Sequence, residues 1–168
     1  EKTLSSALRQ TYSHLEIIVS DDGSTDRTVE IAKSFQEKSL IDFLILPHHQ
    51  YGLVHNWNFC VSQARGKYIK FLFQDDLLEP NCVKEMVSLA EQDDQIGLVF
   101  SPRRIILAES ANFDQDCLDI YQLGRDLHKA WSNLETIQLG QKLLADPNLV
   151  NDPINKIGEP SNVLLRKE

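Results

Sequence analysis

Short apolar runs alternate with amphipathic stretches along the first part of this chain. The apolar runs cover residues 15–19, 43–46, 68–73 and 96–100, and each has the length of a buried β-strand. The stretches between them carry apolar residues at helical spacing and predict helices at residues 27–38, 53–64 and 82–92. Strands that alternate with helices are typical of β-α-β units, so we predict an α/β fold with a mostly parallel sheet flanked by helices.

Capping and turn-forming residues stand where these elements are predicted to begin and end. Asp26 or Thr25 can cap the helix that begins near Arg27, because their side-chain oxygens accept the free N–H groups of a first helical turn. Gly66 can end the second helix, and Pro80 suits the first turn of the third. Each junction between strand and helix is therefore specified locally.

The remaining residues are less regular. We predict a helix at residues 3–10, a helical segment at 134–144 and a final strand at 162–165, with a polar loop at 110–119 and an irregular stretch at 146–160. The first helix has no strand before it, and the chain stops directly after the final predicted strand. We therefore expect residues 1–168 to form a single partial domain; the alternative is a small complete fold with frayed ends.

Composition favours a globular protein that does not bind nucleic acid. The chain has 168 residues, 42% of them hydrophobic, which suffices for one domain with a sizeable core. Its 17 basic and 25 acidic residues give a net charge of −8, whereas nucleic-acid phosphates are bound by clustered Lys and Arg. An acidic protein that binds a phosphate would need a metal cation between the two.

The cysteines and the apolar runs indicate the cellular setting. Cys60, Cys82 and Cys117 are far apart and form no C-x-x-C pair, so we interpret them as small core residues in a reducing compartment. No apolar run approaches the roughly 20 residues that a membrane span needs, and the first residues do not resemble a signal peptide. We therefore expect a cytoplasmic protein with no transmembrane segment in this chain.

Carboxylates follow two of the predicted strands. Asp21, Asp22 and Asp26 come after the first strand, and Asp75 and Asp76 come after the third. Loops that follow parallel strands gather at one edge of a sheet, so these two acidic corners can face one crevice. A divalent cation relieves the repulsion between adjacent carboxylates, and Mg²⁺ fills its other positions with water and substrate phosphate. The alternative is that each carboxylate only caps the next helix and lies in water.

Other phosphate-handling sites are not indicated. The sequence contains neither a P-loop nor a dinucleotide-binding fingerprint. Residues 20–24 are superficially similar to the nucleophile loop of haloacid-dehalogenase-like phosphatases, but Ser20 stands where the nucleophile would be. No later strand ends convincingly in the lysine that response-regulator receivers use.

Three ordered segments carry a family likeness. The first is QTYSHLEIIVSDDGSTD at residues 10–26; the second comprises GLVHNWN, ARGKYIKFL and QDDLLEP within residues 52–80; the third is GEPSNVLLR at residues 158–166. Together they resemble the family 2 glycosyltransferases, whose Rossmann-like fold is called GT-A. The resemblance implies that residues 1–101 form the nucleotide-sugar-binding half and that residues 102–168 begin the acceptor-side half.

The resemblance also implies roles for single residues. Asp22 would accept a hydrogen bond from the base of a uridine-type nucleotide, and Asp21 would support the turn. Asp76, the last residue of the family's D-x-D-like motif, would ligate Mn²⁺ or Mg²⁺. Gln74 stands where many members have another acidic or small residue, so the motif has the shortened form and we assign no ligand role to position 74. The nucleotide-binding residues implied are Asp21, Asp22, Asn58, Arg65 and Asp75.

The activity implied by the resemblance is a metal-dependent, inverting sugar transfer from a nucleotide-diphosphate donor, most simply a UDP-sugar, to the hydroxyl of a glycan or small-molecule acceptor. Such enzymes serve cell-envelope polysaccharide synthesis. The family's first strand would precede Glu1 and its catalytic base would follow Glu168, so we name no base and expect little turnover from this chain alone. The alternative is a noncatalytic nucleotide-sugar-binding module.

We expect structural roles for the other conspicuous residues. His48 and His49 are placed in a solvated loop, because adjacent histidines project poorly onto one ion. Trp57 is expected to be a core residue of its helix and not a stacking platform. His128 and Trp131 are expected to be packing residues, Arg103 and Arg104 a strand-edge or surface pair, and Asp152 and Glu159 surface or loop residues.

Overall fold

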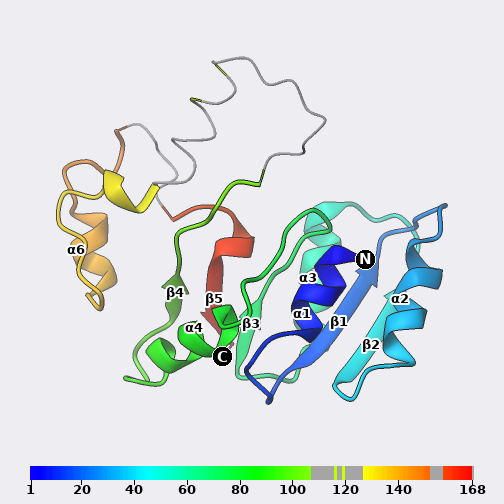
Figure 1. Cartoon of the computed structure of the whole chain (residues 1–168). Coiled ribbons are helices and arrows are strands. Elements are labelled where there is room, and N and C mark those ends of the chain that lie inside the picture. The colour runs from blue at the N-terminus through cyan, green and yellow to red at the C-terminus, as the bar shows by residue number, and fades with distance from the viewer. Residues whose placement is uncertain (107–115, 117–118, 120–126, 152–156, 168) are drawn as a thin grey trace. The chain divides into compact units, whose positions relative to one another are not determined.

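The computed structural model describes residues 1–106, 116, 119, 127–151 and 157–167 (Figure 1). It divides into two compact units, which we treat separately. The first consists of Glu1–Val99 and Leu164–Glu168, and the second of Phe100–Val163. Both predicted acidic corners lie in the first unit.

The first unit begins with a helix and a β-α-β arrangement. Helix α1 (Lys2–Leu8) precedes strand β1 (Glu16–Asp21), and helix α2 (Thr28–Gln36) connects β1 to the parallel strand β2 (Asp42–Pro47). A parallel pair requires such a crossover, which here packs against both strands. Asp26 Oδ1 accepts the N–H of Thr28 at 2.9 Å, so Asp26 is the residue that satisfies the start of α2.

A second group of strands follows helix α3 (Leu53–Gln63), which contacts β1. Strands β3 (Tyr68–Lys70), β4 (Leu98–Phe100) and β5 (Val163–Arg166) form a sheet in the order β3-β5-β4, and β5 is antiparallel to β3. The final predicted strand is therefore confirmed. The predicted strand at 68–73 is wrong in length, because Phe71 and Phe73 leave the ladder and pack their rings against Trp57.

The core of the first unit lies under helix α4 (Cys82–Ala90). Met86, Val87 and Ala90 are buried against Val99 and Leu164, which come from the two strands that follow α4 in the chain. Burying this apolar face is what holds α4, since a helix of nine residues gains little stability alone. Cys60 and Cys82 are free and half-buried, and burial raises the pKa of both thiols, as expected for inert packing residues.

The second unit is less regular. It contains the 3-10 turns η1 (Leu127–Ala130) and η2 (Pro160–Asn162) and helix α6 (Gly140–Leu144), so the helix predicted at 134–144 forms only over its last residues. Trp131 is buried, as predicted, and Glu159 pairs with Arg103 at 3.0 Å. Most of the predicted loop at 110–119, the His128 side chain, Cys117 and Asp152 lie outside the described residues. Within the described part of the chain, no helix has both the length and the apolar character of a membrane span.

Candidate functional site

The turn after β1 is organised by Asp21. The residue is only 6% exposed, and its Oδ2 accepts the N–H of Ser24 at 3.0 Å. The turn passes through Gly23 at φ +87°, where an added Cβ would lie 3.3 Å from the backbone nitrogen of Gln50. The turn after β1 therefore passes close to the loop that follows β2.

Asp22 joins these two segments directly. Its Oδ1 accepts the N–H of Tyr51 at 2.8 Å, and its Oδ2 accepts the N–H of Gly52 at 2.9 Å. A carboxylate offers about four lone-pair positions, so two backbone donors do not saturate it. The Asp22 side chain remains 22% exposed, which leaves it able to accept a further donor from a ligand.

His48 is not in a solvated position, and the prediction for this residue is wrong. Its side chain is only 12% exposed, and its ring packs against the rings of Tyr51 and Phe59, with centroids 5.6 Å and 5.3 Å away. The hydrogen bond to the His49 carbonyl raises the pKa of His48; burial opposes this, and Asn56 and the charges of Asp22 and Asp21 add to the rise. His49 itself is exposed.

Asn56 and Ser20 are site residues that the sequence reasoning missed. His48 Nε2 lies 3.1 Å from Asn56 Oδ1 and 3.0 Å from Ser20 Oγ, so the three side chains form one polar network next to Asp22. Asn58, which the resemblance favoured, is exposed and lies two positions from Asn56, on a different face of α3. The spacing of Asn56 from Gly52, one helical turn, is the signal that could have selected it.

Arg65 is placed at the other edge of the β1-β2 sheet. Its guanidinium lies 3.1 Å from Glu16 and 2.7 Å from Asp42, the residues that begin β1 and β2, whereas Asp22 follows the end of β1. Burial alone would raise the pKa of Glu16, but hydrogen bonds from Arg65 and Gly66 bring it below its ordinary value. The structure does not bring Arg65 together with the acidic corners.

The second acidic corner lies in the loop after β3. Asp75 is exposed and Asp76 is half-buried, and neither carboxylate makes a hydrogen bond or ion pair with another described residue. Burial lowers the pKa of Lys70, and the charge of Asp76 opposes that effect. Helix α1 fixes the backbone of this loop, because the Thr3 hydroxyl donates to the carbonyl of Gln74 at 2.8 Å.

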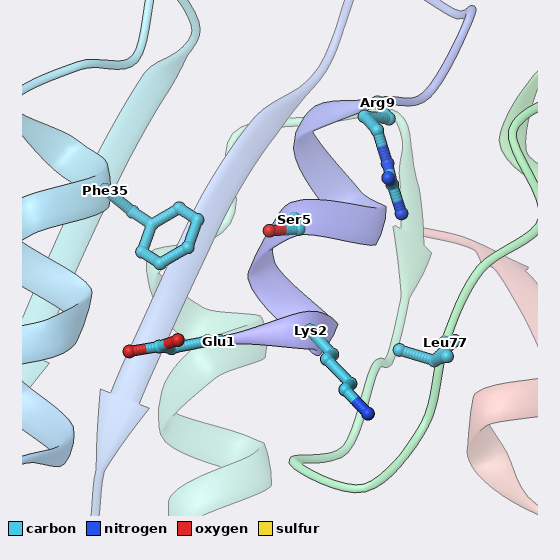
Figure 2. A pocket seen from close by; sticks show the side chains of 6 residues that line it. All are labelled: Glu1, Lys2, Ser5, Arg9, Phe35 and Leu77. Atoms are coloured by element: carbon cyan, nitrogen blue, oxygen red, sulfur yellow. The ribbon is translucent and has the colours of Figure 1, made fainter.

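Helix α3 links the two corners. Asp22 holds Gly52 directly before its first residue, and Trp57, about 7.5 Å further along the helix axis, stacks on Phe73 with the rings 5.1 Å apart. Phe73 in turn lies just before Gln74, Asp75 and Asp76. Strands β1 and β3 run in the same direction (Figures 1 and 2), so the segments that carry both corners leave the same end of these strands.

The residues present suit a cation site only if a ligand completes it. Among the described residues, no three His, Cys, Asp or Glu side chains converge as a protein-only site would require. Mg²⁺ commonly takes one or two carboxylates and completes its shell with water and phosphate oxygens. Asp76, with Asp75 beside it, fits that incomplete arrangement.

A cavity of 360 Å³ lies elsewhere on the first unit, beside α1 (Figure 2). None of the predicted site residues lines it. Its lining residues are Glu1, Lys2, Ser5, Arg9, Phe35 and Leu77.

Known proteins provide an independent comparison. An uncharacterised protein of Mycobacterium tuberculosis is 30% identical over all 168 residues, which span 49% of that protein. An uncharacterised glycosyltransferase of Haemophilus influenzae is 30% identical over 107 residues, 64% of this chain and 33% of that protein. The chain therefore spans about half or less of the length of these relatives.

A solved structure shares the fold. The crystal structure of residues 1–349 of S. aureus TarS in complex with UDP superimposes with a TM-score of 0.56 over 68% of this chain and 33% of that one. At 19% sequence identity the likeness shows the fold alone, and it confirms the predicted GT-A type of α/β architecture. The family model described as glycosyl transferase family 2 matches residues 1–143, which confirms the resemblance of the sequence motifs. This chain belongs to glycosyl transferase family 2.

Proposed function

We propose that residues 1–101 bind the nucleotide-diphosphate sugar of a metal-dependent, inverting glycosyltransferase, and that residues 102–168 begin its acceptor side. The observation that carries the proposal is the placement of the two acidic corners, which α3 joins at one end of β1 and β3. The UDP named in the TarS structure supports a uridine nucleotide as donor. The acceptor is a hydroxyl of a glycan or small molecule.

Each carboxylate has a separate task in this proposal. Asp22 accepts a hydrogen bond from the base, using the exposed part of a carboxylate that Tyr51 and Gly52 already orient. Asp21 fixes the turn, and Asp75 would lie beside the ribose or the metal shell. Asp76 would hold Mn²⁺ or Mg²⁺, which when bound would supply a Lewis acid for the charge that develops on the leaving diphosphate.

We limit the nucleotide contacts to these residues. Arg65 is occupied with Glu16 and Asp42 at the opposite edge of the sheet, and Asn58 lies on a different face of α3 from Asn56. Their proposed roles are structural for Arg65 and peripheral for Asn58. Inverting transfer needs a base within hydrogen-bond reach of the acceptor hydroxyl, and we assign that base to no described residue.

The setting of the enzyme belongs to the same proposal. Free, half-buried Cys60 and Cys82 support a reducing, cytoplasmic location, where a nucleotide-activated donor would be met. A part in cell-envelope polysaccharide synthesis follows only from the family resemblance.

Calorimetry with UDP tests the metal and the donor together. We expect UDP to bind the chain in the presence of Mn²⁺ and to bind at least about tenfold more weakly after chelation or in Asp76→Asn, a loss of about 1.4 kcal/mol. Glu37→Gln, which removes an exposed carboxylate at the end of α2, should bind like the unmodified chain.

The outcomes separate the parts of the proposal. Equal affinities for the unmodified chain, Asp76→Asn and the chelated sample would reject the metal site and leave Lys70 as the group that balances Asp76. If the gene encodes residues beyond Glu168, binding without turnover in that longer product would favour the noncatalytic module. No UDP binding under any condition would reject the donor site.

A further inference from the structure

We propose that His48, with protons on both ring nitrogens, is the positioning residue that holds Asp22 and the Tyr51-Gly52 turn in the donor-binding arrangement, so that nucleotide affinity falls when His48 loses one proton. This inference rests on the proposed donor site and adds a pH response to it. It begins from hydrogen bonds that connect β1, the loop after β2 and α3.

The acceptors around the ring favour a form with two protons. Nδ1 lies 2.8 Å from the carbonyl oxygen of His49, which can only accept, so Nδ1 carries a proton. Nε2 lies 3.1 Å from Asn56 Oδ1, and the amide nitrogen of Asn56 faces the carbonyl of Ser20 at 3.5 Å, a contact that favours this orientation of the amide. With the amide in this orientation Nε2 also donates, which is the imidazolium form that we propose.

Removing one proton disturbs this network. A neutral ring with its proton on Nδ1 would point the lone pair of Nε2 at Asn56 Oδ1, so the amide would have to turn and give up its contact with Ser20. The Ser20 hydroxyl can donate to Nε2 in that state, but it satisfies only one of the two partners. Deprotonation thus loosens the connection between β1 and the start of α3.

The charges around the ring favour the same form. Asp22 Oδ1 lies 3.5 Å from Nδ1, and Asp21 acts on the ring from the same turn of β1. From α3 the ring meets the polar amide of Asn56 and the apolar ring of Phe59, and from its own loop it meets the stacked ring of Tyr51 and the His49 carbonyl. A cation that is only 12% exposed beside two carboxylates is stabilised by them.

His48 acts on the proposed donor site through two groups, the Tyr51 backbone and the Asp22 carboxylate. The His48 ring stacks on Tyr51 at an interplanar angle of 20°, and the N–H of Tyr51 is one of the two donors that orient Asp22. His48 also faces the same Oδ1 atom that accepts this N–H. The proton on His48 therefore influences both the carboxylate proposed to meet the base and the backbone that holds it.

The sign of the pH effect follows from the direction of the shift. The pKa of His48 is raised above its ordinary value of 6.5, so the folded chain keeps the proton to higher pH than the unfolded chain. The stabilising contribution is fully present below 6.5 and is lost as the pH rises through the raised pKa. Donor affinity should decline over the same interval.

The experiment follows UDP affinity with Mg²⁺ between about pH 6 and about pH 8.5, the range in which a histidine titrates. The unmodified chain should lose about fivefold or more in affinity across this range relative to His48→Gln, which cannot titrate. The titration of UDP itself is common to both proteins and cancels. His49→Gln, which changes the exposed neighbour, should keep the profile of the unmodified chain. Parallel profiles for the unmodified chain and His48→Gln would overturn the proposal.

Nuclear magnetic resonance of the unmodified chain tests the positioning role without a ligand. The amide signals of Tyr51 and Gly52 should shift with the same midpoint as the ring nitrogens of His48. Independent midpoints would overturn the inference even if UDP binds. Coupled midpoints without any UDP binding would uphold the positioning role and reject the proposed donor site, so the two failures are distinguishable.

Discussion

Replacing Asp22 with alanine should destabilise the first unit, because the carboxylate is the connection between the turn after β1 and the turn before α3. It accepts two backbone N–H groups at 2.8 Å and 2.9 Å. Removing a charged partner from a hydrogen bond costs about 1.5–3 kcal/mol per bond in a protein interior. Water can replace part of this interaction, since Tyr51 and Gly52 are exposed, so we halve the value and expect a loss of about 1.5–3 kcal/mol in total.

The measurement is urea unfolding monitored by tryptophan fluorescence. The chain has two tryptophans, and Trp57 is the one in the first unit, so Trp131→Phe in every sample leaves a probe beside the site. Linear extrapolation then gives the free energy of unfolding for each protein.

Asp26→Ala provides the matched comparison in the same turn. Asp26 accepts one backbone N–H, that of Thr28, at a fully exposed helix start. Its loss should cost clearly less than the loss of Asp22, because water can replace a single bond at an exposed helix start. A loss for Asp22→Ala no larger than for Asp26→Ala would refute the claim that Asp22 joins the two segments.

Two further changes test the surroundings of the site. Gly52→Ala should lower the free energy of unfolding by about 1–3 kcal/mol, because Gly52 has φ 90° and ψ 164°, a region almost restricted to glycine. No atom lies within 4 Å of an added Cβ, so the cost would come from the backbone conformation alone. Gly97→Ala, where an added Cβ also meets no atom, should be nearly neutral in the same urea assay. Glu16→Gln should be less stable than the unmodified chain above the ordinary carboxyl pKa of 4.5, and the difference should vanish as the pH falls through the lowered pKa of Glu16. A constant difference down to low pH would contradict the pairing of Glu16 with Arg65.

Local signals were enough for most of the first unit. The apolar periodicity at 27–38, 53–64 and 82–92 corresponds to α2, α3 and α4, each a little shorter than expected at its ends. Asp26 also lies where its capping role was predicted. Periodicity and capping act between residues a few positions apart, so they can be recognised without knowing the rest of the fold.

Long-range packing accounts for the errors. The strand predicted at 68–73 ends at Lys70, because Phe71 and Phe73 find a better partner in Trp57 than in a neighbouring strand. His48 looked like a loop residue because its immediate neighbours are polar. Its ring is covered by Phe59, from the middle of α3, which no local pattern places next to it.

The sequence by itself determined most helices and strands of the first unit, the family and the chain positions of the two acidic corners, since short segments carry all of these signals. Only the tertiary structure decided what Asp22, His48 and Arg65 contact. Asp22 accepts backbone N–H groups that lie 29 and 30 positions away in the sequence. His48 contacts Ser20, 28 positions away, and Arg65 contacts Glu16, 49 positions away. Hydrogen bonds of that span form only after the sheet and α3 have packed, because apolar burial, and not the polar groups themselves, brings the segments together.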